Sequence, residues 1–506
     1  MPNIARLIIV AGFCGLLWGT DYHVSVSGKD ANGGSKEAPW ASVGRANRQD
    51  FRPGDRLLFQ GGHVFRGTLQ LDGKDNGISG RPVVVTSYGQ GRATLDGGVG
   101  RAISCAGCRW VAFRNLKLVG AGRKTGNADS GLLIVGGSDV EVDGIEVSGF
   151  RKAGVELNGV DRARILRVHA HENGFAGISV DGAVSRDLYI GYSLTENNPG
   201  DPTVRDNHSG NGIVVGHVQG GTIEHSEARY NGWDMVWNGN GPVGIWAYES
   251  DRVTIQFNIS HHNRSTAEDG GAYDFDGGMT NSVLQYNYSH SNFGAGYLIC
   301  QYEGAGEFAN NVVRYNVSQD DGLLAHNAGI YVWVGGAGMK STVVYNNTIF
   351  NTKGSAVAFG STPQYAAERP KFEFYNNIFV SRMAQIVGGA DRGRFAGNLY
   401  WSMGERGFLV DGYKDFGAWA RATGQEMDKG EMLGQFADPL LRKDGTGLLT
   451  NPADLGKLHE YQLLPGSPAM SRGIDLKAWF GLDPGSRDFF GAPVGTGRPT
   501  VGAVGR

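Results

Sequence analysis

The chain has 506 residues, of which 40% are hydrophobic and 82 are glycine, and its formal net charge at pH 7 is −3. This hydrophobic content is sufficient for a buried core and excludes a disordered protein, while the balanced charge disfavours nucleic acid and acidic membrane surfaces as partners. Glycine exceeds its usual share of roughly 7% and charged residues, at 19%, fall below the usual roughly 25%, a turn-rich composition that favours a β architecture.

The N-terminus is typical of an export signal. Arg6 precedes an apolar run, residues 7–19, that is shorter than the roughly 20 residues a membrane-spanning helix needs. We therefore expect residues 1–20 to be a signal peptide, the mature protein to be secreted (extracellular or periplasmic), and no segment to span a membrane. The alternative for these residues is a buried terminal strand or helix.

The cysteines that remain after removal of such a signal are Cys105, Cys108 and Cys300. Three cysteines cannot form a disulfide framework, and a single C-x-x-C motif without a second pair is weak evidence for zinc or redox chemistry. We expect Cys105 and Cys108 to be either two thiols near a turn or one local disulfide, and we assign no function to cysteine chemistry.

Two short patterns repeat through the middle of the chain with a period of roughly 22–33 residues. The first is a glycine followed by alternating apolar residues, in ranges 131–134, 154–157, 177–180, 212–215, 244–247, 296–299 and 329–332. The second follows each strand pattern and carries an asparagine, at Asn258, Asn287, Asn316, Asn346 and Asn376.

These repeats predict an all-β protein, a right-handed parallel β-helix. A unit of this length with only short strands cannot bury its apolar face alone, but stacked units pair each strand with its equivalents in the coils above and below. The repeated asparagines are expected to stack into a ladder of side-chain hydrogen bonds at one turn. Leucine-rich repeats and propellers have similar periods, but their signatures are missing from this sequence.

Both ends of the chain resemble secreted β-helix proteins of the pectin-lyase-like superfamily. The resemblance is carried by Ala38-Pro-Trp40 and Pro53-Gly-Asp55 near the start, and by Pro465-Gly-Ser-Pro-Ala469 and Asp488-Phe-Phe-Gly491 near the end. With this organisation, residues 21–100 are expected to be an N-terminal cap and first coils, 101–405 the coils that carry a cleft, and 406–506 an irregular C-terminal capping segment. The superfamily includes hydrolases, lyases, epimerases and adhesins, so the resemblance implies a carbohydrate-active protein and leaves the activity open.

Strand alternation predicts which side chains of the central coils face outward. In the strand that begins at Gly244, burial of Ile245 and Ala247 turns Trp246 and Tyr248 outward. The same reasoning in neighbouring coils gives one row of outward pairs along a sheet: Trp246/Tyr248, Asp274/Asp276, Ile299/Gln301 and Tyr331/Trp333.

This row places an acidic pair between large aromatic side chains. Sugar rings stack on aromatic faces, and paired carboxylates can donate and accept protons at a glycosidic oxygen. We therefore expect Asp274 and Asp276 to face solvent as joint acid and base, with reserve catalytic candidates and further contacts on the adjoining loops. The reserve candidates are Asp269, Glu268 and His208, and the expected substrate contacts are Trp246, Tyr248, Gln301, Tyr331, Trp333, Trp237 and His326.

Other interpretations of these residues remain open. An outward aspartate pair is also typical of a solvated face or of a calcium site, which here would use Asp274, Asp276 and Asp206. The aromatic side chains could instead pack beneath a long loop. The histidines His225, His261 and His262 lie near turns of another sheet and are interpreted as structural.

A glycoside hydrolase acting on a polysaccharide or oligosaccharide is the leading functional hypothesis. A β-helix lyase removes the proton next to a uronate carboxylate, commonly with a Lys or Arg base and often with calcium, yet no lysine occurs from Ala153 to Met339. A calcium-assisted polyuronate lyase or epimerase and a non-catalytic glycan-binding surface protein are the alternatives. For the hydrolase we expect a monomer without a cofactor.

Overall fold

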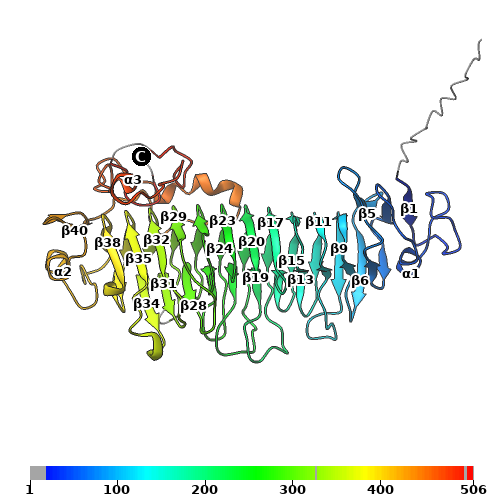
Figure 1. The fold of residues 1–506 in the computed structure, drawn as a ribbon, viewed down its shortest axis with the longest axis horizontal. Coiled ribbons are helices and arrows are strands. Elements are labelled where there is room, and N and C mark those ends of the chain that lie inside the picture. Colours follow the sequence, from blue (N-terminus) through cyan, green and yellow to red (C-terminus); the bar gives the residue numbers. More distant parts are fainter. Residues whose placement is uncertain (1–18, 325–327, 495–497, 505–506) are drawn as a thin grey trace, which may run out of the picture.

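The computed structural model describes residues 19–324, 328–494 and 498–504. Three long sheets of parallel strands wind about one axis, which confirms the predicted all-β class and the right-handed parallel β-helix. Figure 1 shows the coils following one another in chain order along the longest axis. Within the described residues, no helix is long and apolar enough to cross a bilayer.

Each full coil contributes one strand to each sheet, and we number the sheets in the order in which a coil passes through them. Sheet 1 consists of β1 (Asp21–Val24), β2 (Arg56–Gln60), β5 (Val83–Tyr88), β8 (Arg109–Arg114), β11 (Ser138–Asp143), β14 (Arg164–Leu166), β17 (Ser185–Gly191), β20 (Val218–Glu224), β23 (Asp251–Gln256), β26 (Val283–Gln285), β29 (Asn311–Arg314), β32 (Ser341–Tyr345), β35 (Lys371–Tyr375) and β38 (Gly393–Ala396).

Sheet 2 follows sheet 1 in every coil. It consists of β3 (Val64–Arg66), β6 (Ala93–Gly98), β9 (Leu116–Gly120), β12 (Glu146–Ser148), β15 (His169–His171), β18 (Leu194–Glu196), β21 (Glu227–Arg229), β24 (Ile259–His261), β27 (Tyr288–His290), β30 (Val317–Gln319), β33 (Thr348–Asn351), β36 (Ile378–Ser381), β39 (Leu399–Ser402) and β42 (Gln435–Phe436).

Sheet 3 completes each coil and contains the strands of the Gly-initiated repeat. It consists of β4 (Leu69–Leu71), β7 (Ile103–Ala106), β10 (Leu132–Val135), β13 (Ala153–Asn158), β16 (Ala176–Val180), β19 (Asn211–Gly216), β22 (Val243–Tyr248), β25 (Gly271–Phe275), β28 (Tyr297–Gln301), β31 (Ala328–Val334), β34 (Ser355–Ser361) and β37 (Ile386–Val387). The short strands β40 (Met427–Asp428) and β41 (Glu431–Met432) form a separate antiparallel pair.

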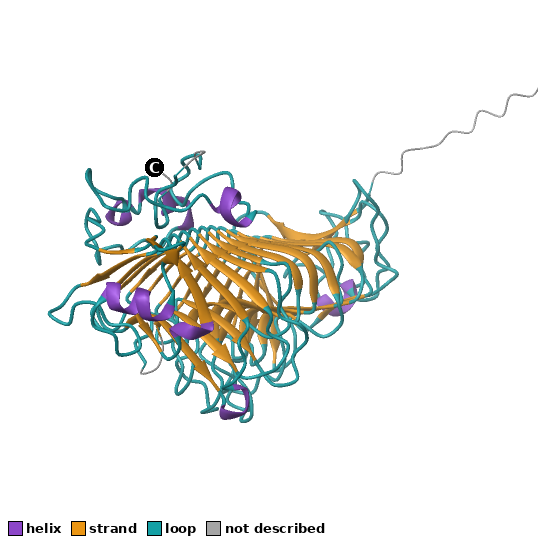
Figure 2. Ribbon diagram, turned by 60° about the vertical axis from the view of Figure 1, so that its left-hand side comes forward, coloured by secondary structure: helices purple, strands orange, loops and turns teal. Residues whose placement is uncertain are grey.

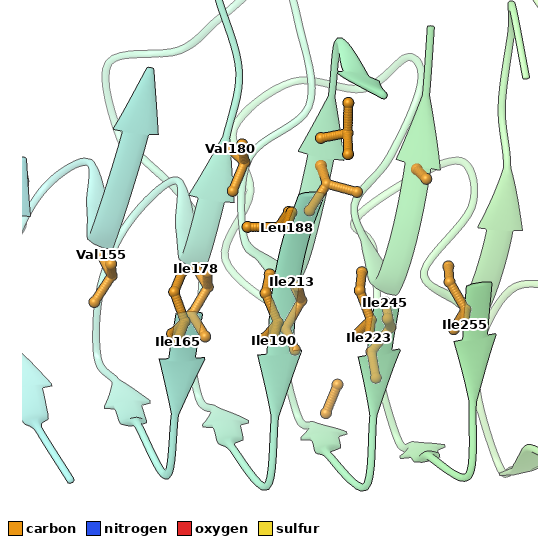
Figure 3. Close-up of a cluster of buried hydrophobic side chains, with 14 of the residues drawn as sticks. Val155, Ile165, Ile178, Val180, Leu188, Ile190, Ile213, Ile223, Ile245 and Ile255 are labelled. Carbon is orange, nitrogen blue, oxygen red and sulfur yellow. The ribbon is translucent and has the colours of Figure 1, made fainter. Parts of the chain in front are cut away.

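The core is a set of apolar columns that run along the axis. Equivalent inward positions of successive coils are in register, so a β-branched residue packs on a β-branched residue from coil to coil (Figure 3). Every coil thus closes the core of its neighbours, and the stability of the array depends on these nearest-neighbour contacts. The columns of sheets 3 and 1 include the fully buried residues Val155, Ile178, Ile213, Ile245, Ile165, Ile190, Ile223 and Ile255.

The predicted asparagine ladder lies at the turn from sheet 1 to sheet 2. The Asn258 side-chain Nδ2 donates to Asn287 Oδ1 at 3.0 Å, and Asn287 Nδ2 donates to Asn316 Oδ1 at 3.1 Å. Each Oδ1 also accepts the backbone N–H of the preceding asparagine, and each Nδ2 also donates to a backbone carbonyl. Buried amide groups are therefore satisfied by the neighbouring coil instead of by water.

The last two predicted members of this ladder are wrong by one residue. The ladder continues from Asn316 through Asn347 to Asn377, while Asn346 and Asn376 take the left-handed turn position at φ 52° and 53°. In the earlier coils an aromatic residue, such as Tyr315 at φ 49°, occupies that position. An Asn-Asn dipeptide offers two buried candidates, and the register of the strands decides which one joins the ladder.

A second polar ladder, which was not predicted from the sequence, lies at the turn from sheet 2 to sheet 3. Its members are joined by Nδ2-to-Oδ1 hydrogen bonds of 2.7–3.1 Å. The spacing between its members varies from 25 to 33 residues, so it does not stand out as a periodic motif. The members are Asn173, Asn198, Asn231, Asn263, Asn292 and Asp321.

The C-terminal segment returns along the outside of the solenoid (orange to red in Figure 1). Tyr288 Oη donates to the Gly447 carbonyl at 2.8 Å, and Tyr345 Oη donates to the Asp483 carbonyl at 2.6 Å. The Asn346 side chain, which is not part of the ladder, donates to the Thr500 carbonyl at 2.9 Å. The segment therefore covers part of sheet 2 and the turn before it. Its described residues do not cover the outer face of sheet 3.

The helices are short and lie at the periphery of the strands (Figure 2). The α-helices are α1 (Val43–Ala46), α2 (Phe416–Thr423) and α3 (Leu476–Phe480), and the 3₁₀ helices are η1 (Pro363–Tyr365), η2 (Ala390–Arg392), η3 (Pro452–Lys457) and η4 (His459–Tyr461).

Two expectations from the N-terminal half can be placed in this frame. Cys105 and Cys108 form a disulfide, which decides between the two alternatives for this motif. The export signal falls almost wholly on residues 1–18, which lie outside the described residues, so it stays a prediction.

We expect Asn287→Ala to destabilise the protein by at least about 2 kcal/mol. The substitution removes Asn287 Oδ1, which accepts from both the backbone N–H and the side-chain Nδ2 of Asn258, and the loss of a buried donor's partner costs about 1–3 kcal/mol. Thermal unfolding of the variant measures the loss, with the exposed loop residue substitution Asn238→Ala as control. An unchanged melting temperature for Asn287→Ala would contradict a stabilising role of the ladder.

Candidate active site

Neighbouring coils bring acidic and aromatic side chains together on the outer face of sheet 3. The register pairs Trp246 with Asp274, Asp274 with Leu298, and Leu298 with Tyr331. Since adjacent strands are about 4.8 Å apart, the acid lies one strand from an aromatic residue on one side and two strands from another on the opposite side. The next outward positions hold, in the same coil order, Tyr248, Asp276, Cys300 and Trp333.

These side chains line a cavity of about 1080 Å³. The loops before β19 and β22 form one wall, where Asn240 Nδ2 donates to Asn207 Oδ1 at 2.8 Å and ties the two loops together. Residues of β34 and β37, among them Phe359 and Val387, continue the lining toward later coils. The volume is at the upper end of the roughly 300–1,000 Å³ typical of small-molecule sites, so more than one sugar ring can be accommodated.

The two aspartates point outward from the core as predicted, but they do not face solvent. Asp274 is only 3% exposed and Asp276 is half-buried, because the surrounding loops enclose this stretch of the sheet. Asp274 Oδ1 has no hydrogen-bond partner among the described residues. Asp276 Oδ1, in contrast, accepts the backbone N–H of Gly277 at 2.8 Å.

The cavity holds three carboxyl groups whose pKa values are raised. Burial raises the pKa of Asp274 well above its usual value, and the nearby charges of Asp276 and Asp269 raise it further. Burial also raises the pKa of Asp276, but hydrogen bonds from the Cys300 thiol and from Gly277 N–H act in the opposite direction. Burial raises the pKa of Asp269 to about 7, although its Oδ2 accepts the Gly241 N–H at 2.8 Å. Desolvation disfavours the charged form of every one of these groups.

The prediction for Gln301 is wrong, because β28 has the opposite register to the one expected. Tyr297, Ile299 and Gln301 point inward, and the Gln301 side chain is fully buried, where it donates to the carbonyls of Gly306 and Ala337. The outward residues are Leu298 and Cys300. Tyr297 fits the core because its hydroxyl lies 2.9 Å from each of two backbone carbonyls, of Asn287 and Val317, that can accept its single proton.

Cys300 is therefore a cavity residue that the sequence analysis missed. Its thiol is free and contacts Asp276 through a hydrogen bond. The Gly-initiated repeat contained the signal: in β22 the residues one and three positions after Gly244 point inward, and the same offsets from Gly296 give Tyr297 and Ile299. Burial raises the pKa of the Cys300 thiol well above its usual value, so the group is a neutral donor.

His208 lines the cavity in a defined tautomer. Asn211 Oδ1 accepts hydrogen bonds from Val243 N–H at 3.2 Å and from Trp246 Nε1 at 3.0 Å, which fixes the orientation of the Asn211 amide. Its Nδ2 therefore donates to His208 Nδ1 at 3.0 Å, and the proton of the neutral imidazole resides on Nε2. Burial lowers the pKa of His208 to about 4, so the ring is neutral at physiological pH.

The aromatic residues form walls of the cavity instead of the exposed platforms expected from the sequence. Trp246 is 4% exposed and packs edge-on against His208, with ring centroids 5.0 Å apart. Tyr248 stacks on Trp246 at 5.3 Å and is half-buried. Tyr331 and Trp333, also half-buried, are 6.1 Å apart on the other side of the acids.

The structure brings most, but not all, of the predicted site residues together. Glu268 lines the cavity and is exposed. Trp237 is not among the lining residues; its Nε1 donates to Asn240 Oδ1 at 2.9 Å and so supports the loop wall from outside. Asp206 is exposed on a loop and does not line the cavity with Asp274 and Asp276. His326 lies outside the described residues.

Comparisons with known proteins agree with the fold. The family model described as "Right handed beta helix region" matches residues 197–379, which include the cavity-bearing coils β19 to β31. The solved structure of a GH136 lacto-N-biosidase from Eubacterium ramulus is similar at 18% identity and a TM-score of 0.51, over 70% of this chain and 66% of that one. A PL6 family alginate lyase is similar at 13% identity and a TM-score of 0.53, over 88% of this chain and 57% of that one.

These matches span less than two thirds of the length of either solved chain, and at this level of identity they establish the architecture alone. A search of curated proteins finds no match.

We expect Asp274→Asn to raise the melting temperature at pH 8. A carboxyl whose folded-state pKa is raised contributes stability that is fully present below the unfolded pKa of about 4 and is lost as the pH rises through the folded pKa. Asparagine does not ionise, so its advantage should be largest at alkaline pH and should shrink toward pH 4.

Thermal unfolding from pH 4 to pH 9 measures this difference. Asp187→Asn is the matched control, because Asp187 is exposed on β17 and its φ of 55° suits asparagine. If the wild type is more stable than Asp274→Asn at pH 8, other interactions must compensate for the cost of burying the Asp274 carboxylate.

Proposed function

We propose that the protein is a carbohydrate-active enzyme, and specifically a glycoside hydrolase that uses Asp274 and Asp276. The observation that carries this proposal is the buried Oδ1 of Asp274, which has no hydrogen-bond partner among the residues that the structure describes and lies in a cavity walled by aromatic side chains. An unsatisfied buried carboxyl oxygen is costly for the free protein. A glycosidic oxygen brought into the cavity would supply the missing hydrogen-bond partner.

The unequal surroundings of the two acids favour different roles. Asp274 has neighbouring negative charges, which keep its proton bound and suit it to donate to the leaving-group oxygen. Asp276 receives hydrogen bonds from the Cys300 thiol and Gly277 N–H, which stabilise its carboxylate and suit it to activate water. Pairs of acids whose pKa values are pushed apart in this way are typical of glycosidases.

The spacing of the pair favours inversion at the anomeric carbon. Residues i and i+2 of a strand have Cα atoms about 6.6–6.8 Å apart, and parallel side chains keep a similar distance. That distance is at the lower edge of the roughly 6.5–9.5 Å that leaves room for a water molecule in inverting enzymes. Retaining enzymes need a closer pair, at about 5–5.5 Å.

The remaining polar groups suit substrate binding. His208, with its proton on Nε2, offers a neutral donor for a sugar hydroxyl. Asp269 and Glu268 stand at the same cavity and remain reserve candidates for the acid or the base. Tyr331, Trp333 and Tyr248 offer faces on which sugar rings can stack.

The charge of the cavity favours a neutral glycan. Among the described residues that line it, none is lysine or arginine, while four carry a carboxyl group. A polyuronate would bring further negative charge to these acids, and a lyase would lack the cationic base that its reaction needs. The solved structures with similar folds are named as a glycoside hydrolase and an alginate lyase, which supports a carbohydrate substrate in general and leaves the reaction to be tested.

Asp274→Asn and Asp276→Asn should each lower turnover by about two orders of magnitude or more, because acid–base catalysis by one positioned group contributes about 10²–10⁴-fold. The assay compares wild type, both variants and the control Asp187→Asn on a panel of neutral and acidic polysaccharides. New reducing ends without an unsaturated chromophore are expected. An unsaturated product that disappears with chelator would indicate a calcium lyase, and tight binding without product a non-catalytic protein.

The pH profile of kcat/KM should be bell-shaped. Its acid limb reports ionisation of the base, Asp276, and its alkaline limb reports loss of the proton from the acid, Asp274, whose pKa is raised further by its neighbours. Initial rates from pH 4 to pH 9 measure the profile. A rate that rises continuously with pH would be incompatible with a protonated aspartate as the acid.

Trp333→Ala should weaken glycan binding by about 1–2 kcal/mol, or roughly 5- to 30-fold, as expected for the loss of one stacking aromatic ring. Binding of oligosaccharides to the inactive Asp274→Asn background measures the effect. Trp233→Ala is the matched control, since Trp233 is 49% exposed on a loop and does not line the cavity. Unchanged affinity together with a large loss of stability would assign Trp333 to packing instead.

A further inference from the structure

A cluster of three histidines lies on sheet 2, apart from the residues that line the cavity. One ring nitrogen from each of His261, His262 and His290 lies within 4.8 Å of the other two. His261 and His290 are 2% and 1% exposed, and His262 is half-buried. The ligand nitrogens of a tetrahedral zinc site, at 2.0–2.1 Å from the ion, are about 3.4 Å apart, so these rings would have to turn and move closer together to share one cation.

The backbone explains how three imidazoles converge. His261 and His290 are register partners on the adjacent strands β24 and β27, and their rings stack with centroids 4.6 Å apart. His262 follows directly in sequence and would point to the opposite face if the strand continued. Its φ of 56° turns the chain, so that His262 Nδ1 lies 2.8 Å from His261 Nδ1.

The second nitrogen of His261 is held by a carboxylate. Its Nε2 lies 2.9 Å from Glu227 Oε1, and Arg229 Nη1 donates to the same oxygen at 3.0 Å. When Glu227 is ionised it accepts the Nε2 proton, which leaves the lone pair of Nδ1 directed at His262. Histidines that bind metals commonly donate their other N–H to a carboxylate in this way.

His290 supplies an independent observation. Its Nε2 is buried and makes no hydrogen bond of normal geometry with the described residues, although a backbone group of Leu449 lies near the ring. A buried ring nitrogen without a partner is costly.

We propose that His261, His262 and His290 bind a divalent transition-metal cation of the zinc type. All three ligand atoms are imidazole nitrogens, a set that suits zinc and its neighbours and does not suit calcium or magnesium, which prefer oxygen. Imidazole binds metal in its neutral form, which predominates above the usual histidine pKa of about 6.5. The partial exposure of His262 leaves a route for the ion and for a water molecule as fourth ligand.

The test uses the full-length protein without a histidine tag, treated with chelator and then titrated with zinc chloride at pH 8, above the pKa of about 7 to which burial raises Glu227. Calorimetry measures binding, and thermal unfolding measures stabilisation by the bound ion. The expected result for the wild type is about one equivalent of zinc and a higher melting temperature with zinc present.

His262→Asn is the main variant, and His225→Asn is its matched control. Both histidines are half-buried at left-handed turn positions that asparagine tolerates, with φ of 56° and 51°, but His225 stacks between Tyr192 and Phe257 outside the cluster. His290→Phe provides a second variant, since it keeps a ring against His261 and removes the ligand.

Zinc affinity should fall at least about tenfold in His262→Asn and in His290→Phe and stay unchanged in His225→Asn. No zinc binding by the wild type at about 100 μM would overturn the proposal, as would equal binding by the wild type and His262→Asn, which would place the ion elsewhere. Neither outcome bears on glycan cleavage, because none of these histidines lines the cavity.

Discussion

The structure depends on one constraint: each turn of the solenoid must find hydrogen-bond partners for its buried polar groups in the next coil. The two side-chain ladders meet this constraint, since every amide both donates along the axis and accepts a backbone N–H from the coil before it. A coil out of register would leave several of these groups unpaired at about 1–3 kcal/mol each. The ladders therefore hold the strands in register, and the register determines which side chains share a row on the surface.

The proposed function depends on that register because a row of outward residues from successive strands forms one surface. On sheet 2 and its preceding turn, the C-terminal segment covers part of the outward row, through contacts such as Tyr288 with Gly447. On sheet 3 the loops before β19 and β22 line one side of the outward row, so a cavity lies over these residues. Burial of Asp274 is thus a property of the loops, whereas its placement beside Trp246 and Leu298 is a property of the strands.

Much of the fold, and the outward direction of several site residues, could be predicted because period-2 alternation and the repeat length are local features of the sequence. The outward direction of Asp274 needed only the knowledge that Tyr273 is buried. The errors arose where two adjacent residues compete for one position: Asn346 and Asn347 for the ladder, Ile299 and Cys300 for the outer face. Burial of the acids and the tautomer of His208 could not be predicted, because they depend on loops and side chains from other coils.

The division of roles proposed for the two aspartates depends on their neighbours more than on their own chemistry. Asp274, Asp276 and Asp269 share one enclosed volume, and among the described lining residues no lysine or arginine balances them. Full ionisation of all three would place like charges in a poorly solvated space, so the cavity retains protons. Within the part of the chain that the structure describes, the hydrogen bonds of Gly277 and Cys300 reach Asp276 and not Asp274, and they favour the ionised form of Asp276. A calcium site would require all of these acids to be ionised together with further oxygen ligands, whereas an acid–base pair requires that they differ, and the asymmetry of their hydrogen bonds favours the second arrangement.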